Sequence, residues 1–177
     1  MANEQWVLDL LHSEVNFSVK HMMISRVNGT FHKYDAKIEA DPADLTTANI
    51  EFTVDLSSVD TKNVDRDGHL KSADFFDVEN YPTLTFKSTN IVKTGENEYA
   101  VTGDLSIRGV TREETFNVVL EGVAKNPMSG AETVGFSVEG KIKRGDYGLV
   151  WNAALETGGV LVSDEVKISL ALEASRA

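Results

Sequence analysis

The sequence contains no cysteine, and this absence excludes a disulfide framework and thiolate chemistry without fixing the compartment. No apolar run approaches the length of a membrane span, so we expect no integral membrane segment. The first residues, MANEQWVLDLLHSEV, lack a basic n-region and an apolar h-region, which predicts no signal peptide and a cytoplasmic location. A trimmed mature form of an exported protein would look the same except for Met1.

Basic residues are scarce: 17 Lys and Arg stand against 28 Asp and Glu, which gives a net charge of -11. This balance argues against binding nucleic acid or an anionic membrane surface, because both need clustered Lys and Arg. Apolar residues make up 41% and charged residues 25%, as in ordinary soluble globular proteins. The chain, 1–177, is predicted to form a single domain with a substantial core.

Alternation of apolar and polar residues is the main structural signal. It is clearest where Ile50, Phe52, Val54 and Leu56 alternate with polar neighbours, a period of two that is typical of a half-buried strand. Roughly eight such stretches follow one another with short connections, which only antiparallel pairing allows. The fold class is therefore predicted as all-β, an antiparallel eight-stranded barrel with a short helical insert, and a β-sandwich is the alternative.

The connections carry their own signals. We expect a corner at 21–24, a turn or bulge at Asn28-Gly29, a hairpin turn at 94–97 and a tight turn at Arg108-Gly109. One helical turn is predicted over 152–157, with Gly158 at its C-cap.

The segment 60–86 interrupts the strands with a dense block of charges and aromatic residues. A short helix is predicted from Val64 to Ala73 with Asn63 as its N-cap. We interpret Phe75 and Phe76 as apolar anchors that hold this insert against one end of the sheet.

The charges of the insert allow two interpretations. His69, Asp67 and Asp74 could form a hydrolase or metal-dependent site, which is the alternative function. No known metal-ligand spacing is present, however, and ion-pair networks often imitate such sites. We favour a structural role, in which Arg66 pairs with nearby carboxylates and His69 makes a hydrogen bond, and expect no catalytic residue, metal or cofactor.

Arg108 also has two interpretations. Its guanidinium could meet an anionic head group, or it could be a turn residue with its charge in water, and we favour the second.

The alternating apolar residues could line a lumen that accepts an apolar chain, or could simply form a filled core. The candidate ligand-binding residues are Phe17, Val19, Phe31, Phe52, Val54, Leu70, Phe76, Phe86, Phe116, Phe136, Val138, Trp151, Ile168 and Leu170.

Several motifs in fixed order resemble the YceI-like family over nearly the whole chain. They are Trp6-Val7-Leu8-Asp9, His12-Ser13-Glu14-Val15, Arg66-Asp67-Gly68-His69-Leu70, Asp74-Phe75-Phe76-Asp77, Tyr81-Pro82, Gly103-Asp104-Leu105-Ser106-Ile107-Arg108-Gly109, Arg144-Gly145-Asp146-Tyr147-Gly148 and Ser163-Asp164-Glu165-Val166.

The resemblance implies a lipocalin-like barrel that binds or carries a polyisoprenoid or another long-chain lipid, without catalysis. A homodimer is a further expectation for its assembly. Many members of that family carry a signal peptide and work in the periplasm, and this sequence differs from them there.

Overall fold

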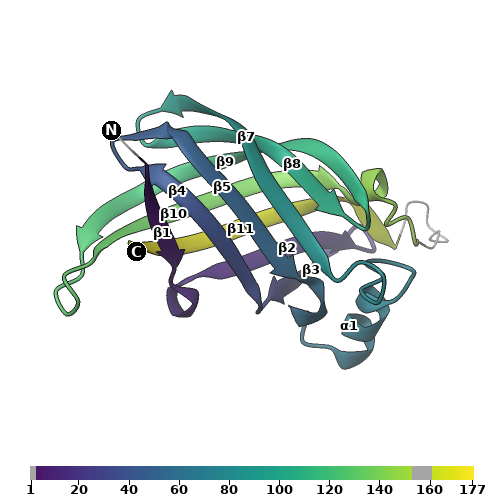
Figure 1. The fold of residues 1–177 in the computed structure, drawn as a ribbon. Helices are drawn as coiled ribbons and strands as arrows, with labels where there is room; N and C mark the ends of the chain where they lie inside the picture. The colour runs from purple at the N-terminus through teal and green to yellow at the C-terminus, as the bar shows by residue number, and fades with distance from the viewer. Residues whose placement is uncertain (1–2, 153–160) are drawn as a thin grey trace.

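The structure is a computed structural model that describes residues 3–152 and 161–177. Strands account for most of this part of the chain, and a single short α-helix lies at one end (Figure 1). In chain order the elements are β1 (Glu4–Leu8), η1 (Leu10–His12), β2 (Glu14–His21), β3 (Ser25–Phe31), β4 (Tyr34–Asp41), β5 (Asp44–Asp55), η2 (Leu56–Ser58), β6 (Val59–Asp60), α1 (Val64–Lys71), β7 (Thr83–Gly95), β8 (Glu98–Ile107), β9 (Val110–Lys125), β10 (Glu132–Lys143), η3 (Arg144–Tyr147) and β11 (Val162–Arg176).

The sheet closes on itself through antiparallel pairs in the order β1-β4-β5-β7-β8-β9-β10-β11, and β11 pairs back with β1. This ring has eight strands, as the sequence predicts, and closure rules out the open edges of a sandwich. The assigned strands outnumber eight because three barrel strands are interrupted. For example, β1 pairs with β11 at Ala174–Arg176, and after η1 the chain continues as β2 beside Val162–Ala171 of the same strand.

The inward faces follow the predicted period of two. In β8, Tyr99, Val101, Gly103, Leu105 and Ile107 are buried, whereas the residues that alternate with them are more exposed. Because successive side chains of a strand point to opposite faces, each strand contributes every second residue to the barrel interior. The buried apolar residues therefore gather inside the barrel.

The prediction of a turn or bulge at Asn28-Gly29 is wrong, because both residues lie within β3. Gly29 pairs with Phe17, and a Cβ at Gly29 would lie 2.2 Å from the Phe17 ring. This glycine makes room for an inward aromatic side chain. The chain reverses at 22–24, as the corner predicted at 21–24 requires, and Met22 and Met23 have positive φ angles of 53° and 65° there.

The other turn predictions agree with the structure. Arg108 and Gly109, with φ of 52° and 75°, connect β8 to β9, as expected for a tight hairpin turn. The predicted turn at 94–97 joins β7 to β8. The helical turn predicted over 152–157 with Gly158 falls mostly at 153–160, outside the described residues.

Helix α1 spans Val64–Lys71, and the side chain of Asn63 accepts a hydrogen bond from Arg66 N at 2.9 Å. The predicted helix and its cap are therefore confirmed, although the helix ends two residues before Ala73. It lies in the connection between β6 and β7, at one end of the barrel (Figure 1). None of the helices in the described part of the chain combines the length and the apolarity needed to cross a membrane.

Replacing Gly103 by Ala is expected to destabilise the barrel by about 1–3 kcal/mol, as overpacking does elsewhere. A Cβ at Gly103 would lie 2.3 Å from the backbone oxygen of Lys87, so the β7–β8 pair must shift. The matched control is Gly122→Ala in β9, where a Cβ meets nothing within 4 Å. Urea melts of both variants measure the difference, and equal midpoints would contradict the prediction.

Candidate functional site: the barrel lumen

The barrel encloses a cavity of about 420 Å³, which is within the usual range of small-molecule sites. Side chains from nearly every strand and from the 60–86 insert line it. Of the two interpretations of the apolar face, a hollow lumen therefore describes this barrel better than a filled core.

Every residue of the predicted ligand-binding set lines this cavity. They are Phe17, Val19, Phe31, Phe52, Val54, Leu70, Phe76, Phe86, Phe116, Phe136, Val138, Trp151, Ile168 and Leu170. The strand residues among them occupy inward positions of the alternation, and Leu70 and Phe76 reach the cavity from the insert. Their contact with a ligand stays a prediction.

The sequence interpretation missed many other apolar lining residues, including Val15, Ile38, Leu45, Ile91, Tyr99 and Val101. Most of these also lie on inward positions of strands. Extending the period of two along each whole strand would have found them.

The polar side chains that line the cavity were also missed. They are Asn16, Lys20, His21, Arg66, His69 and Arg144. No Asp or Glu is among the described lining residues, although the chain carries 28 of them. The charged side chains among these lining residues, Lys20, Arg66 and Arg144, are therefore all cationic.

Contacts place these groups at the α1 end of the barrel. His21 pairs with Val162 at the start of β11, and Arg144 donates from Nη2 to Val162 O at 3.1 Å. Arg144 also lies against the Phe75 ring of the insert, 5.8 Å from its centroid. The cavity thus has one polar end, which we call the cationic mouth and define by Lys20, His21, Arg66, His69 and Arg144.

Arg144 is the buried cation of this mouth, with 6% of its surface exposed. Its Nη1 donates to Leu149 O at 2.6 Å and to Trp151 O at 2.9 Å, and its Nε donates to Ser163 O at 2.9 Å. Burial lowers the pKa of Arg144, and the charge of Asp164 opposes this shift. No carboxylate of the described residues lies within ion-pair distance of the guanidinium, which is held by backbone carbonyls.

His69 lies between two aromatic rings. Its imidazole meets Phe75 at 5.0 Å and Trp151 at 4.7 Å between ring centroids, in both cases edge to face. Its Nε2 lies 2.9 Å from Asp74 Oδ2, which confirms the expected structural hydrogen bond. These contacts join the insert to the segment after η3 beside the cationic mouth.

The described residues of the insert do not bring His69, Asp67 and Asp74 together as the enzymatic alternative requires. The Asp67 carboxylate accepts hydrogen bonds from Thr61 N at 2.9 Å and from Thr61 Oγ1 at 2.5 Å. It is not part of the His69–Asp74 pair. The expectation that Arg66 pairs with carboxylates is wrong, because Arg66 donates to Thr61 Oγ1 and Thr61 O. In the described ranges, the group of three metal-ligating side chains that converges is found elsewhere, at Asp9, His12 and Glu173.

Arg108 is a turn residue, as the favoured interpretation states, but the expectation that its charge lies in water is wrong. Its Nη1 donates to Gly148 O and its Nη2 to Ala73 O, each at 2.8 Å. The side chain therefore ties the β8–β9 turn to both η3 and the insert at the α1 end.

A family model described as the YceI-like domain matches residues 6–174. A UPF0312 protein of Staphylococcus epidermidis is 46% identical over 167 residues, which are 94% of this chain and 95% of that protein. A UPF0312 protein of Staphylococcus aureus is 42% identical over 170 residues, with 96% of each chain covered.

Solved structures match the same barrel. BcnA of Burkholderia cenocepacia superimposes with a TM-score of 0.82 at 30% identity, covering 94% of this chain and 98% of its own. The YceI protein of Campylobacter jejuni gives 0.78 at 34% identity, with 89% and 90% covered. A polyisoprenoid-binding domain from Saccharophagus degradans gives 0.72 at 16% identity, with 98% and 99% covered, and that likeness concerns the fold alone.

Proposed function

The chain belongs to the YceI-like family, and from this premise we propose that its barrel binds or carries a polyisoprenoid or a similar long-chain amphiphile, without catalysing a reaction. The observation that carries the proposal is a hollow lumen whose wall is largely apolar outside the cationic mouth. A polyisoprenoid-binding domain with the same fold is consistent with it.

The apolar wall supports binding of a hydrocarbon tail. Each methylene group that leaves water contributes ~0.8 kcal/mol, so a long chain can be held without any polar contact. Such a wall recognises apolar surface and little else, so we expect tolerance of chain length and branching.

The cationic mouth supports one orientation of the amphiphile. The opposite part of the cavity, towards the β4–β5 and β7–β8 turns, is lined by residues such as Ala40, Leu45, Ile91 and Tyr99. A polar head there would lose its hydration with few partners, at a cost of several kcal/mol. The tail therefore points to those turns, and the head group lies among Lys20, His21 and Arg66.

A Val118→Trp variant is expected to bind a long polyprenol at least about tenfold more weakly, a loss of about 1.4 kcal/mol. Val118 lines the cavity, and an indole there narrows a lumen that has room for one slim chain. Val119→Trp is the matched control, because the next residue of β9 points to the opposite face. Uptake of a labelled polyprenol measures the affinity of both variants.

Native mass spectrometry of the purified protein tests the proposal directly. We expect a co-purifying amphiphile, or uptake of added polyprenol by protein stripped of lipid, and less uptake by Val118→Trp. Absence of uptake by the stripped, folded protein would overturn the proposal. The cytoplasmic location and the homodimer stay predictions, to be tested by fractionation and by mass measurement in solution.

A further inference from the structure

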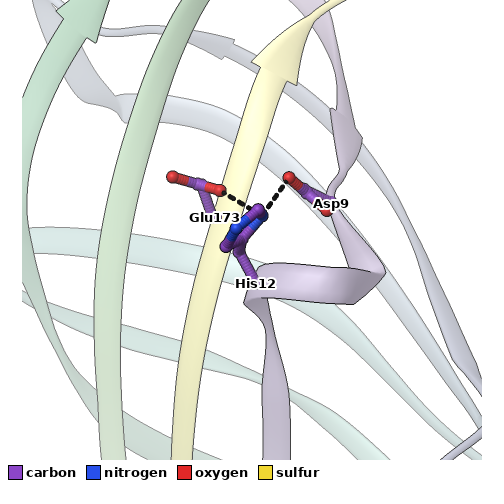
Figure 2. A group of neighbouring side chains, drawn as sticks. All are labelled: Asp9, His12 and Glu173. Carbon is purple, nitrogen blue, oxygen red and sulfur yellow. Dashed lines mark hydrogen bonds and ion pairs between the residues drawn. The ribbon is translucent and has the colours of Figure 1, made fainter. Parts of the chain in front are cut away.

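A second group of polar side chains lies outside the lumen, where β1 meets β11. It consists of Asp9, His12 and Glu173, and Figure 2 shows the imidazole of His12 between the two carboxylates. His12 Nδ1 is 2.6 Å from Asp9 Oδ2 and 3.3 Å from Glu173 Oε2. Their side chains are 68%, 33% and 36% exposed for His12, Asp9 and Glu173, so the group is open to solvent.

The backbone holds these three residues in place independently of their side-chain contacts. Asp9 N donates to Glu173 O at 2.8 Å, and His12 N donates to Asp9 O at 3.2 Å. The buried Ser13 hydroxyl accepts from Glu173 N at 3.0 Å. Asp9 also caps η1 by accepting from Leu11 N through Oδ1, which leaves its Oδ2 for the group. Backbone hydrogen bonds therefore hold in place the residues that carry the three candidate ligand atoms.

The donor set matches one class of ligand. A nitrogen and two carboxylate oxygens suit a divalent transition ion such as Zn²⁺, and a tetrahedral ion with bonds of about 2.0–2.2 Å separates its ligands by about 3.3 Å. The Nδ1–Oε2 separation of 3.3 Å already has this value, and all three ligand atoms lie within 4.8 Å of one another. The Nδ1–Oδ2 separation of 2.6 Å is that of a hydrogen bond and must widen when an ion takes the place of the proton. Two carboxylates and a neutral imidazole would also balance the charge of the ion.

We propose that Asp9, His12 and Glu173 form a site for a divalent transition metal ion, with a water molecule completing the coordination. The ion replaces the proton that His12 Nδ1 otherwise shares with the carboxylates. Asp9 and His12 belong to the segment between β1 and β2, whereas Glu173 belongs to β11. The site therefore lies on the seam that closes the barrel, where β11 passes from pairing with β1 to pairing with β2.

Zn²⁺ added to the untagged full chain, stripped of metal by a chelator, tests the proposal at pH 7.5. We expect saturable binding of one equivalent by calorimetry and a Tm raised by about 5 °C when free Zn²⁺ exceeds its Kd about a hundredfold. In NMR spectra the ring signals of His12 should shift on binding. Those of His32 should not, because this histidine lies 2.9 Å from Asp60 but has no third ligand among the residues that the structure describes.

Variants separate this site from scattered surface binding. His12→Ala and Glu173→Gln should each weaken Zn²⁺ binding at least about tenfold and abolish the rise in Tm. His32→Ala is the matched control and should bind Zn²⁺ like the parent chain. Circular dichroism of the metal-free variants reports whether they remain folded. Absence of one-equivalent binding to the parent chain, or unchanged binding by folded His12→Ala, would overturn the proposal, and neither result bears on lipid binding in the lumen.

Discussion

Replacing Arg144 by Ala is expected to lower the free energy of unfolding by about 3–5 kcal/mol. Arg144 is nearly fully buried and donates to four backbone carbonyls, those of Leu149, Trp151, Val162 and Ser163. Truncation leaves these acceptors without the guanidinium, and each unsatisfied buried acceptor costs about 1–3 kcal/mol. Some of that loss is recovered by water at the mouth, so the expected total is smaller than the sum. Urea melts with two probes measure it.

Two variants define what the Arg144 result means. Arg144→Lys keeps a cation but offers a point charge in place of a planar fork, so we expect a loss between those of Arg144→Ala and the parent chain. Arg112→Ala removes an arginine that is 52% exposed and 3.9 Å from Asp146, and should change stability by less than about 1 kcal/mol. If Arg144→Ala melted like Arg112→Ala, the hydrogen bonds from Arg144 to the four carbonyl groups would not stabilise the fold.

The apolar wall of the lumen could be predicted because it depends on local periodicity. Phe52 and Val54 alternate with Glu51, Thr53 and Asp55, and the pleat of a strand converts that alternation into two faces. Closure into a barrel then places one of the faces inside. The prediction needed no knowledge of which strands are neighbours.

The cationic mouth could not be predicted in the same way, because its contacts are non-local and involve the backbone. The partners of Arg144 are carbonyl oxygens after η3 and at the start of β11, and a carbonyl leaves no mark in the sequence. The same holds for Arg108, which joins a turn to Gly148 and Ala73. The sequence shows that a residue is charged but not which carbonyl groups surround it, so the charge is predicted to face water.

The group of Asp9, His12 and Glu173 needed the topology. Asp9 and His12 lie near the start of the chain and Glu173 near its end, so spacing cannot connect them. They meet because β11 pairs with both β1 and β2, on either side of η1. Gly29 is misinterpreted for another reason. The glycine predicts a turn or bulge, whereas it lies in a strand and leaves space for the Phe17 ring.

The two phenylalanines of the insert line the cavity but have different surroundings. Phe75 is 5% exposed and packs on His69, on Trp151 at 5.6 Å and under the Arg144 guanidinium. Phe76 is half-buried, and its ring lies edge-on to Phe31 at 6.0 Å between centroids. Phe75 therefore anchors the insert, whereas Phe76 lines the cavity next to Phe31.

Truncation separates the two roles. Phe75→Ala should cost about 3–5 kcal/mol of unfolding free energy, as for other fully buried phenylalanines. Phe76→Ala removes a partly exposed ring and should cost about 1–2 kcal/mol. Under the proposed lipid binding, exchange of a fluorescent lipid should become faster, because the variant removes a large ring from the cavity wall beside Phe31. Denaturant melts run beside the exchange assay measure both effects on the same samples. Wild-type-like melts and unchanged exchange in both variants would show that neither ring anchors the insert or limits access. The insert would then be held by Arg108 and by the contact of His69 with Trp151 instead.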